Sequence, residues 1–168
     1  MTTSATMKEK NMKTTQLFAI AGIPLVQPGD DLGKMIFETA SRESFTFEDG
    51  DIITIASKIV SKAEDRLIDV DKIEPSPQAL TLAKKLNAEP RSIELILRET
   101  KRFLRVNPDV LLTEHRLGFI CTKAGVDSSN TAPGPKGKIV ALLPKNPDLS
   151  AKKIRKTIQS LSKKKVAV

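Results

Sequence analysis

Residues 52–66 read IITIASKIVSKAEDR, and this stretch says more about the fold than any other. Its first five residues, 52–56, form a short apolar run rich in β-branched side chains, which predicts a buried strand. From Ser57 to Arg66 the sequence turns abruptly polar. Polar groups at the end of a buried strand are well placed to bind a ligand, although an ordinary exposed strand-to-loop junction gives the same pattern.

Working outward, further strands are indicated by short apolar runs bounded by turn-forming residues. These runs occupy residues 16–26, 110–112, 119–121 and 138–143, and a strand begins at 166–168. Residues 28–31 and 48–51 are rich in Gly, Pro and Asp, which predicts turns at both places.

Helices are predicted where a capping residue precedes regularly spaced apolar residues. One runs from residue 32 to about 41 after two aspartates, and another from 77 to about 86 after Ser76. Ser92 is the expected cap of a third helix and Asp148 that of a fourth, whose apolar stripe is Ala151, Ile154, Ile158 and Leu161. Because strands and helices do not alternate as βαβ units, the predicted class is α+β, a mixed sheet with flanking helices.

The composition is typical of a cytoplasmic protein with an aliphatic core. Hydrophobic residues make up 39% of the 168 residues, with six Phe and no Trp or Tyr. No apolar run approaches the roughly 20 residues that span a bilayer. Residues 1–15 are polar and are expected to form a disordered extension. The single Cys121 cannot build a disulfide framework and is expected to be buried.

The positive charge is concentrated at the end of the chain. Residues 135–168 hold ten Lys or Arg and one acid, Asp148, so this segment carries a charge of +9. The rest of the chain carries −1, which gives the overall net charge of +8. Such a segment can bind polyanions without sequence preference. No aromatic residue is interleaved with these cations, so base stacking has no support and nucleic-acid binding is not the expected main role.

A second candidate site lies at residues 124–130, which read AGVDSSN. Asp127 offers a hard oxygen ligand suited to Mg²⁺ or Mn²⁺, and Asn130 could contact a nucleotide. A plain surface turn is the alternative, since Gly, Asp, Ser and Asn are common turn formers. Residues 134–138 lack the spacing of a phosphate-binding loop, and the isolated His115 favours a surface or structural role.

Four segments, in the order in which they occur along the chain, resemble segments of the F420-0:gamma-glutamyl ligase family. They are GIPLVQPGDDL at 22–32, FEDGDIITIASKIVSKAEDR at 47–66, GFICTKAGVDSSN at 118–130 and LLPKNPDLSAKKIR at 142–155. Together they place residues 16–168 as the N-terminal part of the ligase domain. The resemblance implies a homodimer that joins L-glutamate to coenzyme F420-0 at the expense of GTP, through an acyl phosphate, with Mg²⁺ or Mn²⁺ and K⁺ as an additional ion.

The resemblance also implies a role for individual residues. A GTP-contacting loop would comprise Ile23, Pro24, Leu25 and Val26. The nucleotide and its phosphates would be contacted by Ser57, Lys58, Lys62 and Asn130. Asp127 would bind a divalent metal, so Lys58, Lys62 and that metal are expected to converge on one polyphosphate.

The sequence also departs from the family pattern. Asp65 stands where the family usually has Gly, and Thr122-Lys123 replaces an Ala-Asn or Val-Asn pair. The later segment that supplies further metal ligands in the family is not found here, so the chain is expected to be truncated relative to the full ligase fold and inactive or incomplete by itself. A non-catalytic module that binds GTP or a partner is the alternative function.

Overall fold

A computed structural model describes residues 14–129 and 139–168. The α-helices are α1 (Leu32–Arg42), α2 (Ser57–Ala63), α3 (Pro77–Leu86), α4 (Pro90–Glu99) and α5 (Pro147–Ser162). The strands are β1 (Leu67–Asp69), β2 (Thr100–Val106), β3 (Leu111–His115), β4 (Ile120–Thr122) and β5 (Ile139–Ala141). Two 3-10 turns, η1 (Val70–Lys72) and η2 (Lys123–Gly125), complete the described elements, and the α+β class is confirmed.

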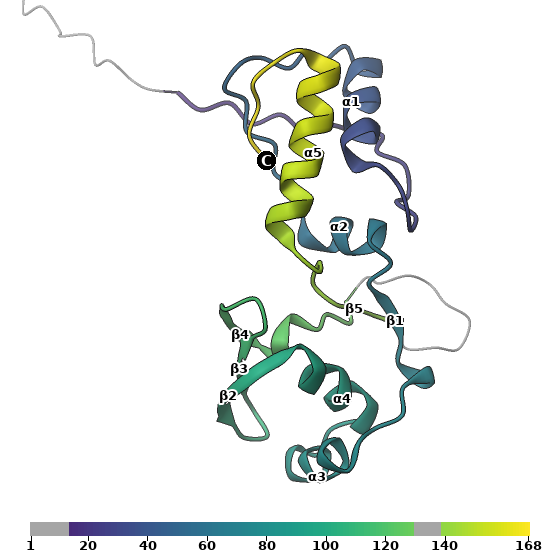
Figure 1. The fold of residues 1–168 in the computed structure, drawn as a ribbon, viewed down its shortest axis with the longest axis vertical. Helices are drawn as coiled ribbons and strands as arrows, with labels where there is room; N and C mark the ends of the chain where they lie inside the picture. The colour runs from purple at the N-terminus through teal and green to yellow at the C-terminus, as the bar shows by residue number, and fades with distance from the viewer. Residues whose placement is uncertain (1–13, 130–138) are drawn as a thin grey trace, which may run out of the picture.

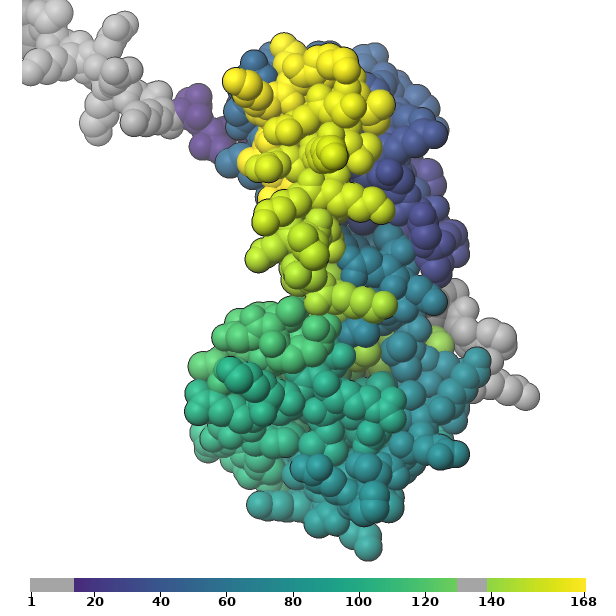
Figure 2. Space-filling model, viewed as in Figure 1, coloured from purple at the N-terminus to yellow at the C-terminus, as the bar shows by residue number. Residues whose placement is uncertain are grey.

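The elements form two lobes stacked along the long axis of the molecule (Figures 1 and 2). One lobe contains α1, α5 and the two ends of the described chain. The other contains α3, α4 and an antiparallel sheet in the order β2-β3-β4. Helix α2 and the β1–β5 pair lie between the two lobes. Of the helices that the structure describes, none has the length and apolar character needed to cross a bilayer.

The core of the first lobe is the contact between α1 and α5. Asp31 begins α1 by accepting a hydrogen bond from the backbone N–H of Lys34, as predicted. The buried side chains of this core include Leu32, Ile36, Ala40, Ile154 and Ile158. Gly33 allows the close approach, because a Cβ at this position would lie 2.6 Å from the Cβ of Thr157.

The second lobe is built on an α3–α4 hairpin that packs against the three-stranded sheet. Ser76 caps α3 by accepting from the N–H of Ala79, and Pro77 occupies the first helical position, as predicted. The buried apolar residues here are Ala79, Ala83, Leu86, Ile93, Ile96, Leu111 and Ala124.

The junction between the lobes depends on pairing between distant parts of the chain. β1 runs antiparallel to β5, with Leu67 opposite Ala141. On its other side, Ala141 forms a bridge with Asp127, through N–H···O distances of 2.7 and 3.0 Å. Strand β5 therefore fixes Asp127 relative to the residues that follow α2.

Two predicted strands are wrong. Residues 16–26 form no regular structure, and Leu17 is 92% exposed. Residues 52–56 form only a single parallel bridge, between Ile52 and Ala167, and Ile52 is 74% exposed. Apolar composition favours a strand only where a neighbouring strand supplies hydrogen bonds along its length. The predicted strand at 166–168 is likewise limited to this bridge.

Two predicted caps are also wrong, by two or three residues. Glu89, not Ser92, caps α4, and its carboxylate accepts from the N–H groups of Arg91 and Ser92. Asn146, not Asp148, caps α5 by accepting from the N–H of Leu149. In both cases a proline directly after the true cap takes the first helical position, which shifts the start of the helix toward the N-terminus.

The remaining strand predictions are displaced or incomplete. The segments predicted at 110–112 and 119–121 become β3 and β4, and β5 occupies only 139–141. Strand β2, with the sequence TKRFLRV, was not anticipated because charged residues interrupt its apolar ones. Cys121 is partly rather than fully buried, and Leu161 of the predicted α5 stripe is 43% exposed.

Candidate functional site

The structure brings Lys58 and Asp127 into direct contact. The Nζ atom of Lys58 lies 2.7 Å from Oδ2 of Asp127, although the two residues are far apart in the sequence. The side chains retain 24% and 41% of their exposure, so the pair lies at the surface of the molecule. These residues represent the two polar segments singled out in the sequence, and their contact makes one site of them.

Ser129 completes this site. Its carbonyl oxygen and, at 3.3 Å, its hydroxyl oxygen both face the Lys58 ammonium. Its N–H and hydroxyl groups donate to Oδ1 of Asp127 at 2.8 and 2.6 Å. The Lys58 ammonium and these Ser129 donors together hold the pKa of the Asp127 carboxyl at about 2, so the carboxylate is ionised throughout the physiological range.

Different elements position the two charged groups. Lys58 is the second residue of α2, a short helix that replaces the predicted strand-to-loop junction. Asp127 follows η2 and is held by its backbone bridge to β5. Leu142, the residue after β5, donates its N–H to the carbonyl of Arg66 at 3.0 Å, which links the chain after α2 to the strand that holds Asp127.

The other residues implied by the family resemblance differ in exposure and in the element that carries them. Ser57 begins α2 and is exposed, whereas Lys62 is partly buried one helical turn after Lys58. Residues separated by four in a helix lie on one face, so Lys62 shares the side of α2 that carries Lys58.

The predicted GTP-contacting loop precedes α1 and is mostly open to solvent. Ile23 is 37% exposed, Pro24 is exposed and Leu25 is 75% exposed, but Val26 is buried in the core of the first lobe. Gly29, three residues further on, donates its N–H to the carbonyl of Ala63 at 2.8 Å, which holds this segment against the end of α2. Asn130 lies outside the described residues, as do residues 134–138 and 1–13.

The chemistry of the Asp127 site suits a cation. Its carboxylate already holds the ammonium of Lys58, together with carbonyl and hydroxyl oxygens of Ser129. Within 14–129 and 139–168, no three His, Cys, Asp or Glu side chains gather in a way that could hold a metal ion. A metal at Asp127 would therefore take its other ligands from Ser129, water, phosphate oxygens or groups beyond those residues.

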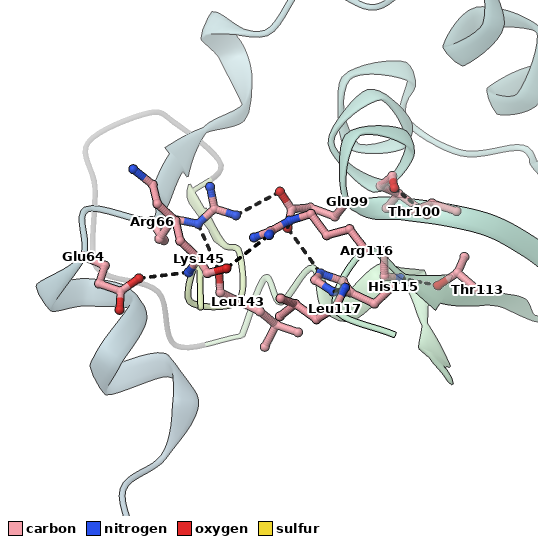
Figure 3. Close-up of polar contacts among 12 residues, drawn as sticks. Glu64, Arg66, Glu99, Thr100, Thr113, His115, Arg116, Leu117, Leu143 and Lys145 are labelled. Atoms are coloured by element: carbon pink, nitrogen blue, oxygen red, sulfur yellow. Dashed lines mark hydrogen bonds and ion pairs between the residues drawn. The ribbon is translucent and has the colours of Figure 1, made fainter. Parts of the chain in front are cut away.

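A second polar cluster was not anticipated from the sequence (Figure 3). Glu99, at the end of α4, accepts hydrogen bonds from Arg66 and Arg116, each at 2.9 Å. Arg66 also donates to the carbonyl of Leu143 at 3.0 Å, and Arg116 donates to the carbonyl of Lys145 at 3.2 Å. Burial raises the pKa of Glu99, but the two guanidinium groups more than offset this, so the net shift is downward.

His115 belongs to this cluster and is fully buried, which confirms a structural position rather than a surface one. Its Nδ1 accepts the N–H of Leu117 at 3.0 Å, so the ring proton sits on Nε2, which lies 3.2 Å from Glu99. Burial lowers the pKa of His115 despite the nearby Glu99 carboxylate. The neutral ring therefore serves as a packed hydrogen-bond donor, stacked on Phe119 with ring centroids 5.0 Å apart.

Comparison with known protein families gives a match that covers the segments of both polar sites. A family model described as F420-0:Gamma-glutamyl ligase matches residues 21–168, a range that includes Lys58, Asp127 and the Glu99 cluster. The chain therefore belongs to the F420-0:gamma-glutamyl ligase family.

Individual relatives agree with this assignment. The chain is similar to a coenzyme F420:L-glutamate ligase of Methanopyrus kandleri, at 46% identity over 84% of this chain and 54% of that protein. Proteins of the same name from Methanothermobacter thermautotrophicus and Methanocaldococcus jannaschii are 40% and 47% identical, over 90% and 74% of this chain. The alignments cover 59% and 48% of those two proteins, so the chain spans about half the length of the curated relatives it matches.

Proposed function

We propose that this chain provides the phosphate- and cation-binding part of a GTP-dependent ligase that joins L-glutamate to coenzyme F420-0. The observation that carries the proposal is the 2.7 Å contact between Lys58 and Asp127. An ammonium for phosphate and a carboxylate for a cation are the two groups that a triphosphate site needs side by side. Here they come from the two segments that also carry the family resemblance.

The proposed reaction has two steps. A carboxylate oxygen of F420-0 attacks the γ-phosphorus of GTP, a P–O bond forms, and the bond to the β-γ bridging oxygen breaks to release GDP. The glutamate amine then attacks the acyl carbon, forms the C–N bond, expels phosphate and loses a proton. A bound divalent cation would neutralise phosphate charge in the first step. Lys58 and Lys62 would bind phosphate oxygens, and the segment containing Ile23, Pro24 and Leu25 would contact the nucleotide.

Nucleotide binding by the 168-residue chain is the first test. We expect GTP to bind in the presence of Mg²⁺ or Mn²⁺, as measured by calorimetry. Lys58→Met should weaken that binding about 10- to 100-fold, since a charge-assisted hydrogen bond contributes roughly 1.5–3 kcal/mol. Lys34→Met is the matched control, because Lys34 is an exposed lysine on α1. Equal GTP affinity of the two variants would contradict the assignment of Lys58.

Catalysis is tested by supplying what the relatives have in addition. The chain is mixed with a polypeptide covering the unmatched half of the Methanopyrus kandleri relative, and glutamate addition to F420-0 is followed by mass spectrometry. We expect turnover only with both parts, because the described residues bring no three His, Cys, Asp or Glu side chains together that could hold a metal ion. GTP binding without turnover under all conditions would instead support the non-catalytic binding module.

A homodimer is part of the same proposal. Ile120 on β4 and Phe119 just before it are apolar residues that remain 61% and 42% exposed, and a second copy would cover them. Sedimentation over a range of concentrations should show dimerisation, and Ile120→Lys should weaken it. A chain that remains monomeric at every concentration would rule out the dimer for this polypeptide.

A further inference from the structure

The Lys58 ammonium lies in a small cradle of oxygen atoms. It contacts Oδ2 of Asp127 at 2.7 Å, the hydroxyl of Ser129 at 3.3 Å and the carbonyl oxygen of Ser129. All three oxygens come from one stretch of three residues, whereas the ammonium reaches in from α2. A carboxylate, a hydroxyl and a carbonyl are together a set of hard oxygen ligands, the kind that Mg²⁺ and Mn²⁺ prefer.

The cradle is held in shape by contacts that do not involve Lys58. Oδ1 of Asp127 accepts the N–H of Ser129 at 2.8 Å and its hydroxyl at 2.6 Å. The backbone of Asp127 is bridged to Ala141 of β5. These bonds orient Oδ2 toward Lys58, so the oxygen set should persist when the ammonium leaves.

We propose that Asp127 and Ser129 form one cation cradle, and that Lys58 is its tethered occupant, which leaves for a phosphate oxygen when a divalent cation enters with the nucleotide. This inference rests on the proposed function for the nucleotide, but the cradle is defined by the geometry alone. It assigns Ser129 a role as a ligand and makes Lys58 the group that couples binding of the cation to binding of the nucleotide.

Exchange follows from electrostatics. A divalent cation and an ammonium that contact the same Oδ2 repel each other, so entry of the cation favours departure of the ammonium. The pair is also free to open, since both side chains are partly exposed and lysine carries its charge on a flexible four-carbon stem. A triphosphate offers the displaced ammonium new oxygen partners, so nucleotide and cation should each favour binding of the other.

The test measures binding of Mn²⁺ alone, by electron paramagnetic resonance, to the full chain without nucleotide. Lys58→Met removes the competing ammonium and should tighten Mn²⁺ binding about tenfold, a typical size for such coupling. Lys58→Gln repeats the test with a polar side chain, and the thermal midpoint of each variant checks that it is folded. Asp127→Asn should abolish Mn²⁺ binding, and Ser129→Ala should weaken it about three- to tenfold, roughly the value of one lost ligand hydroxyl.

The same titrations are then repeated with GTP present. In the wild-type chain GTP should tighten Mn²⁺ binding, and this enhancement should be largely lost in Lys58→Met, while Lys34→Met behaves as wild type. If neither Lys58 variant binds Mn²⁺ more tightly without nucleotide, the tethered-occupant inference is overturned, whatever GTP does. If the wild-type chain binds Mn²⁺ but not GTP, the proposed function fails and the cradle stands.

Discussion

Glu99 is the buried carboxylate at the centre of the cluster that contains Arg66, Arg116 and His115. It retains 6% of its exposure, yet it accepts hydrogen bonds from two arginines and faces a histidine. Burial, with a smaller contribution from the positive charges of Arg116 and Arg66, lowers the pKa of His115 despite the Glu99 carboxylate, so a further proton on the ring is unfavourable. The neutral ring instead donates to Glu99 and accepts from Leu117.

Replacing Glu99 should therefore be costly. Glu99→Gln keeps the shape of the side chain but leaves two guanidinium groups without their carboxylate, and the free energy of unfolding should fall by about 3 kcal/mol. Urea denaturation measures this change. Glu38→Gln is the control, because it breaks an exposed Lys34–Glu38 pair on α1 and should cost less than about 0.5 kcal/mol. Similar losses in the two variants would argue against a stabilising role for the buried cluster.

His115 should make the stability depend on pH. Its pKa is lowered in the folded protein, mainly by burial, so below about pH 6.5 the unfolded chain binds a proton that the folded chain does not. Stability is then highest above that pH and falls as the pH drops, with a slope of at most about 1.4 kcal/mol per pH unit. Urea denaturation between pH 7.5 and 5.5 isolates this effect, because His115 is the only histidine of the chain. A slope that persists in His115→Asn would assign it to another group.

At the scale of the element, four of the five α-helices that the structure describes begin where a local side-chain acceptor satisfies their first N–H groups, whereas α2 has no such cap. Asp31, Ser76, Glu89 and Asn146 perform this task for α1, α3, α4 and α5. In the last three, a proline follows the cap. This combination fixes the start of each helix more firmly than the charge of a nearby acid, because the hydrogen bond is directional.

The start of α5 gives a direct comparison of two neighbouring residues. Asn146→Ala removes the cap and should lower the free energy of unfolding by about 1 kcal/mol. Asp148→Ala removes only a favourable charge in the first turn, for which about 0.3–0.5 kcal/mol is expected. Thermal denaturation at low ionic strength measures both losses of stability. The reverse order of the two losses would restore Asp148 as the cap.

At the scale of the whole molecule, the two lobes are joined by few contacts. Arg66 contributes several of them, since its side chain reaches Glu99 of α4 and the carbonyl of Leu143, and its own carbonyl accepts from Leu142. Glu64 adds another, because it accepts from the N–H of Lys145 at 2.9 Å and from the hydroxyl of Ser150 (Figure 3 shows the first of these). The relative position of Lys58 and Asp127 depends on this junction.

Arg66→Ala should loosen the junction without unfolding either lobe. We expect the amide protons of Asp127, Ala141 and Leu142 to exchange at least about tenfold faster, which corresponds to a loss of roughly 1.4 kcal/mol in local stability. Amides in the centres of α1 and α4 should be little affected. Hydrogen exchange followed by NMR resolves these sites, and Arg66→Lys should give an intermediate effect. Uniform acceleration across both lobes would indicate global destabilisation instead.

The helices were the most predictable part of the fold because their signals are local. Asp31 and Ser76 each cap a helix through an acceptor only three residues away. Strands were less predictable, since their stability depends on partners elsewhere in the chain. The apolar residues 52–56 lack such a partner over most of their length, whereas the charged strand β2 gains one in β3.

The proximity of Lys58 and Asp127 was expected from the family resemblance, but the contacts that hold the two residues together were not. The family resemblance named Lys58 and Asp127, and the structure places them in contact. Ser129 was not singled out, although its neighbour Asp127 was, because an isolated serine in a turn carries no distinctive signal. The Glu99 cluster gave no signal either, since its members are scattered from Arg66 to Lys145.

The amino-acid sequence by itself determined the α+β class, the positions of α1 and α3, the concentration of positive charge at the end of the chain and the resemblance to the ligase family. These follow from composition, from hydrogen bonds between residues close together in the sequence and from the order of motifs. Only the tertiary structure decided that Lys58 pairs directly with Asp127, that Ser129 joins them, and that Glu99 contacts two arginines and His115. Such contacts join residues far apart in the sequence, and their formation depends on how helices and strands pack rather than on any local preference.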